Sequence, residues 1–167
     1  MTKDGKMELM APAGNFESLQ AALDNGADSV YFEVEQLNMR ARASINFTMD
    51  DLPEIVKRCE EKGVRSYLTL NTIIYDHDLS LIKNLLDRAK EAKITAVIAM
   101  DQSVIAYARQ IGIEIHISTQ INVTNIETVK FYAMFADTMV LSRELSLKQV
   151  KKICEQIIKD DVRGPSG

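Results

Sequence analysis

The sequence feature that most constrains the fold is an alternation that occurs six times along the chain. A short apolar run ends in a polar cluster, and a helical stretch follows. The clusters are Pro12–Asn15, Tyr31–Glu33, Asn71–Thr72, Asp101–Gln102, Ser118–Gln120 and Ser142–Glu144. Strands joined by helices pair in parallel, so their carboxyl ends share one face. The polar clusters therefore predict a binding or catalytic rim on that face.

The apolar runs predict strands near residues 7–11, 28–32, 64–70, 95–100, 113–117 and 138–141. Helices are predicted near 16–25, 48–62, 79–92, 102–111, 124–135 and 146–159. Asn15 is expected to cap the first helix, and Thr48 with Asp51 forms a capping-box variant at the second. Helix and strand alternate throughout, which predicts a mostly parallel sheet.

The repeat of roughly 25 to 30 residues is typical of βα units. A closed (β/α)₈ barrel usually takes about 250 residues, and this chain has 167. The sequence therefore predicts an α/β fold with a TIM-barrel-like repeat, about six of eight units around a parallel sheet, as an incomplete barrel. A complete open sheet of six strands is the alternative. We expect residues 1–6 to be an N-terminal tail, 7–159 the barrel-like domain, and 160–167 a linker or a cut end.

Composition excludes several classes of protein. With 46% hydrophobic and 26% charged residues, the chain is typical of a folded soluble domain. No apolar run reaches the roughly 20 residues of a membrane helix, and no signal peptide is evident, so we expect a cytoplasmic protein without a membrane partner. The net charge of -4 predicts no general footprint for nucleic acid, although a local basic patch stays open. An unclosed barrel has two bare edges, which predicts self-association or missing sequence.

The fifth apolar run carries two candidate site residues. Its isoleucines share one side of the strand, and His116 and Ser118 share the other, which faces the lumen in a barrel. The alternative for His116 is a buried ring held by a polar neighbour. Ser118 and Gln120 offer hydroxyl and amide groups that suit a polar ligand, or else they serve in turn and capping chemistry.

Arginines supply the remaining distinctive chemistry. Arg40 and Arg42, in the long connection after the second strand, could clamp a carboxylate or phosphate, or lie in a solvated loop. Arg143 and Glu144 could pair with each other or line the rim. The candidate substrate-binding residues are therefore Asn15, Arg40, Arg42, Asn71, Asp101, His116, Ser118, Gln120, Arg143 and Glu144. We expect the ligand to be a polar or anionic substrate, either peptide or RNA.

Catalytic residues cannot be assigned from the sequence. There is no P-loop, GxGxxG, HExxH or GxSxG motif. Cys59 and Cys154 lie in separate predicted helices without a CxxC motif, which argues against a disulfide or zinc site. His77 lies in a polar turn, which predicts a surface loop. We therefore expect no metal or cofactor within this chain, and a Ser or Cys hydrolase gains little support.

Six segments, taken in order, resemble peptidase family U32, the collagenase-like proteases. They are Glu8–Asn15, Gly26–Tyr31, Arg40–Arg42, Leu70–Thr72, Ile115–Gln120 and Leu141–Leu147. The resemblance covers about residues 7–158 and implies a TIM-barrel-like N-terminal domain. Some members are described as proteases, including collagenases. Others take part in hydroxylation of tRNA, ribosomal RNA or ubiquinone precursors, with cysteines that bind an iron–sulfur cluster.

The resemblance also implies that this chain is the front portion of a longer protein. The family's His-Gly-Ala-Leu-Cys stretch is absent here, so an iron–sulfur cluster is expected only in the full-length protein. At Tyr31–Val34 the chain departs from the family's usual Tyr-Leu-Gly-Gly turn, so no ligand contact is carried over to this turn. Three functions stay open: RNA-base hydroxylation, proteolysis, and a non-catalytic fragment that binds a ligand or partner. We expect no robust activity from the fragment alone.

Overall fold

Six parallel strands form the centre of the molecule. The computed structural model describes residues 7–35 and 47–167. The strands are β1 (Met10–Pro12), β2 (Ser29–Phe32), β3 (Arg65–Leu70), β4 (Ala96–Ala99), β5 (Glu114–Ile117) and β6 (Thr138–Met139). Each strand pairs in parallel with the next one along the chain, so the sheet order is β1-β2-β3-β4-β5-β6. The predicted parallel α/β arrangement is confirmed.

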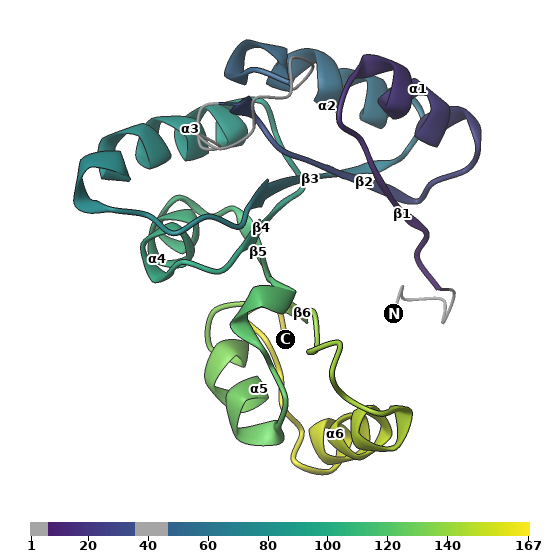
Figure 1. Cartoon of the computed structure of the whole chain (residues 1–167), viewed down its shortest axis with the longest axis vertical. Helices are drawn as coiled ribbons and strands as arrows, with labels where there is room; N and C mark the ends of the chain where they lie inside the picture. The colour runs from purple at the N-terminus through teal and green to yellow at the C-terminus, as the bar shows by residue number, and fades with distance from the viewer. Residues whose placement is uncertain (1–6, 36–46) are drawn as a thin grey trace.

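Helices cover one face of this sheet. They are α1 (Phe16–Asp24), α2 (Leu52–Glu61), α3 (Leu79–Glu91), α4 (Gln102–Ile111), α5 (Ile126–Ala133) and α6 (Leu147–Lys159). Short 3₁₀ turns lie at η2 (Met49–Asp51), η3 (Asp76–Asp78) and η4 (Thr119–Ile121). Figure 1 shows the strands on the inside of a curl and the helices around it. The fold is a curled half-barrel, as the prediction of an incomplete barrel required, rather than a flat open sheet.

Local chemistry sets the helix ends. The Asn15 side chain accepts a hydrogen bond from the Ser18 amide at 2.8 Å, and the Ser18 hydroxyl accepts from the Asn15 amide at 3.1 Å. The Thr48 amide likewise donates to the Asp51 carboxylate at 2.7 Å. Gly112 ends α4 with φ of 73°, a conformation that costs glycine little. The predicted cap at Asn15 is therefore confirmed, because its side chain satisfies an amide that the first helical turn leaves unpaired. The predicted pairing of Thr48 with Asp51 also forms, but it caps the short turn η2, and α2 begins at Leu52 rather than near residue 48 as predicted.

The two end strands are shorter than the sequence predicted. β1 begins at Met10 rather than at residue 7, and β6 ends at Met139 rather than at 141. An end strand has a ladder partner on one side only, so fewer of its residues meet the pairing pattern. The residues just before β1 and just after β6 are held by a side-chain hydrogen bond and by an isolated bridge instead. The Leu9 amide donates to the Asp28 carboxylate at 2.8 Å, and Leu141 forms an isolated parallel bridge with Val123.

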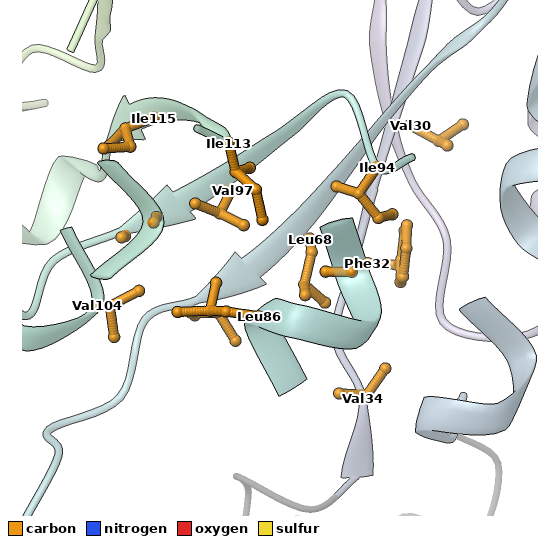
Figure 2. Close-up of a cluster of buried hydrophobic side chains, with 14 of the residues drawn as sticks. Val30, Phe32, Val34, Leu68, Leu86, Ile94, Val97, Val104, Ile113 and Ile115 are labelled. Atoms are coloured by element: carbon orange, nitrogen blue, oxygen red, sulfur yellow. The ribbon is translucent and has the colours of Figure 1, made fainter. Parts of the chain in front are cut away.

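The main core lies between the sheet and the helices. Alternate residues of the strands, among them Phe32, Leu68 and Val97, point to this layer and are almost fully buried. Figure 2 shows these side chains meeting Leu86 of α3 and Val104 of α4. The prediction that the isoleucines of the fifth strand face the helices is confirmed, since Ile113, Ile115 and Ile117 belong to this core. The other strand face is consequently left for the lumen.

Residues after α6 lie against the start of β6. The Ser166 amide and hydroxyl donate to the Asp137 carboxylate at 3.0 and 2.9 Å. Gly164 lies so close to Asp137 that a Cβ atom would stand 2.2 Å from the carboxylate oxygen. The end of the described chain is therefore held by specific contacts. None of the helices in the described ranges has the length and apolar character needed to cross a membrane.

The central strand provides a test of this core. Leu68 has no exposed surface, so Leu68→Ala should lower the free energy of unfolding by about 2–5 kcal/mol through lost burial and a residual cavity. Ile73, in the loop after β3, is 65% exposed, and Ile73→Ala should change it by less than about 0.5 kcal/mol. Urea titration followed by circular dichroism measures both. Equal losses would contradict the assignment of Leu68 to the core.

Candidate functional site

A polar pocket lies at the carboxyl ends of the strands. Its volume is about 220 Å³. The residues around it come from the last two positions of β3 and from the segments that follow β2, β3 and β5. They are Glu33, Val34, Thr69, Leu70, Asn71, Thr72 and Gln120. We call this the rim pocket. Parallel strands that end at one edge bring these distant segments together, as the sequence predicted for the rim.

Three polar atoms in the rim pocket have no hydrogen-bond partner. They are Thr69 Oγ1, Asn71 Oδ1 and Thr72 Oγ1, and each atom is buried. Thr69 as a whole is only 7% exposed. A buried polar atom without a partner costs about 1–3 kcal/mol, and such atoms are few in native proteins. Their concentration around one cavity identifies the rim pocket as the candidate ligand site.

Two of the predicted binding residues meet in this pocket. Asn71 follows β3 directly, and Gln120 lies in η4 after β5, with its side chain exposed at the pocket wall. These two positions are more than forty residues apart in the sequence. The sheet brings them together because only one strand, β4, separates β3 from β5.

Three other predicted residues serve as caps. Asn15 caps α1, as described above. Asp101 caps α4 through the Ser103 amide at 2.8 Å, and its second oxygen accepts from the Ile74 amide at 3.4 Å. The Ser118 hydroxyl accepts from the Gln120 amide at 3.2 Å and is 1% exposed. These side chains shape the loops of the rim, which leaves their predicted contact with substrate untested.

Arg143 and Glu144 do not line the rim pocket. Arg143 and Glu144 are exposed in the turn before α6. Glu144 accepts a hydrogen bond from the Ser142 hydroxyl, and this bond, followed by a backbone amide, lowers the pKa of the Glu144 carboxyl. Arg40 and Arg42 lie outside the described residues.

His116 faces the lumen below the rim. Its Nε2 lies 2.8 Å from Glu114 Oε1, and its ring stands edge-on to Tyr67 with centroids 4.7 Å apart. His116 is 7% exposed. This is the arrangement that the alternative interpretation described, a buried ring held by a polar neighbour. His77, by contrast, lies on the surface and stacks on Tyr75.

Tyr67 links His116 to a charged pair that the sequence analysis missed. The Tyr67 hydroxyl donates to Glu8 Oε1 at 2.8 Å, and Arg65 Nη2 lies 2.5 Å from Glu8 Oε2. Burial alone would raise the pKa of Glu8, but the nearby Ser29 and Tyr67 hydroxyls and the Arg65 charge outweigh it and lower that pKa. Burial, together with Glu8, raises the pKa of Tyr67 well above its ordinary value. We call Glu8, Arg65, Tyr67, Glu114 and His116 the lumen network.

The sequence analysis placed Glu33 and Thr72 in polar clusters of the rim, but it missed Thr69 as a member of the pocket. Thr69 lies inside the predicted strand 64–70, before the polar cluster that marks the strand's end, so it was not considered as a site residue. One signal was present: Tyr67, Thr69 and Asn71 alternate along β3 and share its lumen side. A polar stripe on one side of a buried strand indicates a lumen that contacts polar groups.

Cysteine positions do not fit an iron–sulfur cluster. Such clusters are commonly held by four cysteine thiolates, and this chain has two cysteines. Cys59 is buried in α2, where burial raises the pKa of its thiol to about 11, and Cys154 is exposed on α6. Within residues 7–35 and 47–167, no three His, Cys, Asp or Glu side chains form a group that could hold a metal ion.

The lumen network predicts a pH dependence of stability. The pKa of Glu8 is lowered in the folded protein, so its stabilising contribution is complete above its ordinary value of 4.5 and is lost as the pH falls through the folded value. In the wild type, the free energy of unfolding should therefore fall as the pH is lowered below 4.5. Glu8→Gln should make this fall with pH less steep. Urea titrations across this pH range measure the effect. Glu91→Gln, exposed on α3, controls for the loss of a negative charge, and an equal flattening there would contradict the assignment.

Comparisons with known proteins agree with this geometry. A solved U32 peptidase superposes with a TM-score of 0.71 over 93% of this chain and 67% of that chain, at 16% identity, which shows a shared fold. A collagenase from Porphyromonas gingivalis is 52% identical over 96% of this chain. A tRNA hydroxylation protein from Bacillus subtilis is 30% identical over 91%, and a 23S rRNA 5-hydroxycytidine synthase from Escherichia coli is 31% identical over 89%.

The chain spans only part of these relatives. It covers 39% of the collagenase, 36% of the tRNA hydroxylation protein and 22% of the rRNA synthase. The model of peptidase family U32 matches residues 14–162, which is most of the chain and includes the segments that form the rim pocket. The chain therefore belongs to peptidase family U32.

Proposed function

We propose that the protein, at its natural length, takes part in hydroxylation of RNA bases and that this chain supplies part of the substrate-binding rim. The observation that carries the proposal is the rim pocket, which has unpaired neutral hydroxyl and amide groups. Such groups bind and orient a polar substrate. Relatives named for tRNA and rRNA hydroxylation match about nine-tenths of this chain, which supports RNA as that substrate.

The described hydroxyl groups near the rim give little support to proteolysis. A serine nucleophile needs an adjacent base with a pKa suited to accept its proton. Ser118 is buried and accepts a hydrogen bond from the Gln120 amide. Ser142 donates to Glu144, but the lowered pKa of that carboxyl makes it a weak base. Among the described hydrogen bonds, the His116 ring contacts Glu114 and no serine hydroxyl.

The name of one relative favours a second candidate function. The Porphyromonas gingivalis protein, at 52% identity, is named a collagenase. If proteolysis is the activity, its nucleophile or metal ligands belong to residues outside the described ranges. The rim pocket would then hold part of a peptide.

In the proposed hydroxylation, the chain's own residues bind and position the substrate. An iron–sulfur cluster, when bound, supplies redox chemistry. Because Cys59 and Cys154 do not fit a cluster, we propose that its thiolates come from the rest of the full-length protein. We also propose a cytoplasmic location, where tRNA and ribosomal RNA are found.

RNA analysis tests the main proposal. Deletion of the full-length gene should abolish one hydroxylated pyrimidine in tRNA or ribosomal RNA, measured by mass spectrometry of nucleosides, and the wild-type gene should restore it. Unchanged hydroxylation would reject the proposal. Purified full-length protein is expected to leave gelatin and casein intact, and cleavage that survives protease-free repurification would favour the second candidate.

Bare sheet edges give a further prediction about assembly. Among the described residues, β1 and β6 each pair on one side only, and Met10 and Val140 beside them are exposed. Unpaired strand edges associate readily. We therefore expect residues 1–167, expressed alone, to self-associate in light scattering. A stable, monodisperse monomer would contradict this expectation.

A further inference from the structure

We propose that the rim pocket binds the sugar of the RNA substrate and recognises the neighbouring hydroxyls of a ribose. This inference rests on RNA being the substrate, as proposed above. It concerns a separate question, namely which part of a nucleotide the pocket contacts. The argument depends on the hydrogen-bonding capacity of the groups in the pocket, on the charge of its wall and on the cost of leaving those groups unpaired.

The first step is the balance of donors and acceptors. Thr69 and Thr72 each present a hydroxyl, which can donate one hydrogen bond and accept others. Asn71 presents an amide, and Glu33 adds a carboxylate that only accepts when ionised. A ribose diol has the complementary capacity, because each of its hydroxyls both donates and accepts. A carboxylate just after a strand is also the group that holds ribose hydroxyls in dinucleotide-binding folds, and Glu33 follows β2 directly.

The second step concerns the ligands that this wall disfavours. Among its described lining residues, the pocket has the Glu33 carboxylate and no cationic side chain. A phosphate would therefore find no cationic partner among these described residues. The same described residues include no aromatic ring, whereas unpaired bases are usually held by stacking on aromatic side chains or arginine. The sugar is the part of a nucleotide that suits a wall rich in hydroxyl and amide groups without a described cation or aromatic ring.

The third step is energetic. A buried hydroxyl without a partner lowers the stability of the folded protein. Thr69 could be replaced by valine, which has nearly the same shape, and the unpaired oxygen would disappear. A stabilising substitution that impairs function is the signature of a group retained for binding. The 2′-hydroxyl is also the feature by which proteins distinguish RNA from DNA, so a sugar site would provide that selection.

The test uses the full-length protein and small probes. Saturation-transfer NMR with uridine reports which ligand protons lie against the protein. We expect the strongest transfer at the ribose protons H2′ and H3′, rather than at the base protons H5 and H6. Replacing uridine by 2′-deoxyuridine should raise the dissociation constant about tenfold, the effect of losing one good hydrogen bond.

Two matched variants separate binding from folding. Thr69→Val should raise the dissociation constant for uridine about tenfold, with a melting temperature equal to or above that of the wild type. Thr95→Val is the control, because Thr95 Oγ1 accepts from the Ser66 amide at 3.1 Å at the opposite end of the sheet. It should lower the melting temperature and leave uridine binding unchanged.

Several results would overturn the inference. They are equal affinity for uridine and 2′-deoxyuridine, strongest transfer at the base protons, binding of a Gly-Pro dipeptide in place of uridine, or no detectable binding of uridine. Loss of stability in Thr69→Val with unchanged affinity would also overturn it, since the hydroxyl would then be structural.

The experiments distinguish failure of the ribose assignment from failure of the proposed RNA hydroxylation. If RNA from the deletion strain keeps all its hydroxylated bases, RNA hydroxylation is rejected even when the pocket binds ribose. If hydroxylation is lost but uridine binds through its base, only the sugar assignment fails.

Discussion

Apolar packing between the outer face of the sheet and the helix layer is the interaction on which the rest of this structure depends. Leu68 and Val97 are completely buried there, together with Leu86 and Val104 from the helices. Strand side chains alternate, so once one face is committed to this layer the other face must line the lumen. A register slip of one residue would place Thr69 and His116 in the apolar layer at a large cost in free energy.

The lumen face is divided into two levels with different chemistry. Near the amino ends of the strands, Glu8, Arg65 and Tyr67 satisfy one another, and Glu114 holds His116. Near the carboxyl ends, Thr69, Asn71 and Thr72 have unpaired polar atoms. Paired polar groups stabilise and rigidify a fold, whereas unpaired ones weaken it unless a ligand completes them. Structure and binding are thus assigned to opposite ends of the same strands, as in other parallel barrels.

Membership of a family named for peptidases does not decide which reaction the protein catalyses. The fold places a polar pocket at the rim, but a fold hosts many reactions. Close relatives carry names from proteolysis and from RNA hydroxylation. The described part of the chain contributes hydrogen-bonding groups to the rim pocket. The described residues therefore do not by themselves decide between these reactions.

Much of the fold and part of the site could be predicted from the sequence. The helix cap at Asn15 depends on contacts within a few residues, so local pattern was sufficient. The six βα units and the inward side of the fifth strand followed from hydrophobic periodicity. The ends of β1 and β6 were misplaced, because pairing at a sheet edge depends on neighbours that periodicity does not report.

By itself the sequence determined the order of elements, the parallel sheet and the edge at which polar groups gather, since all three follow from local periodicity and from the geometry of βα connections. Only the tertiary structure decided which polar groups are paired. It paired Tyr67 with Glu8, and it left the Thr69 and Thr72 hydroxyls without partners. The physical reason is that hydrogen bonding depends on distances between segments far apart in the chain, and the curl of the sheet sets those distances.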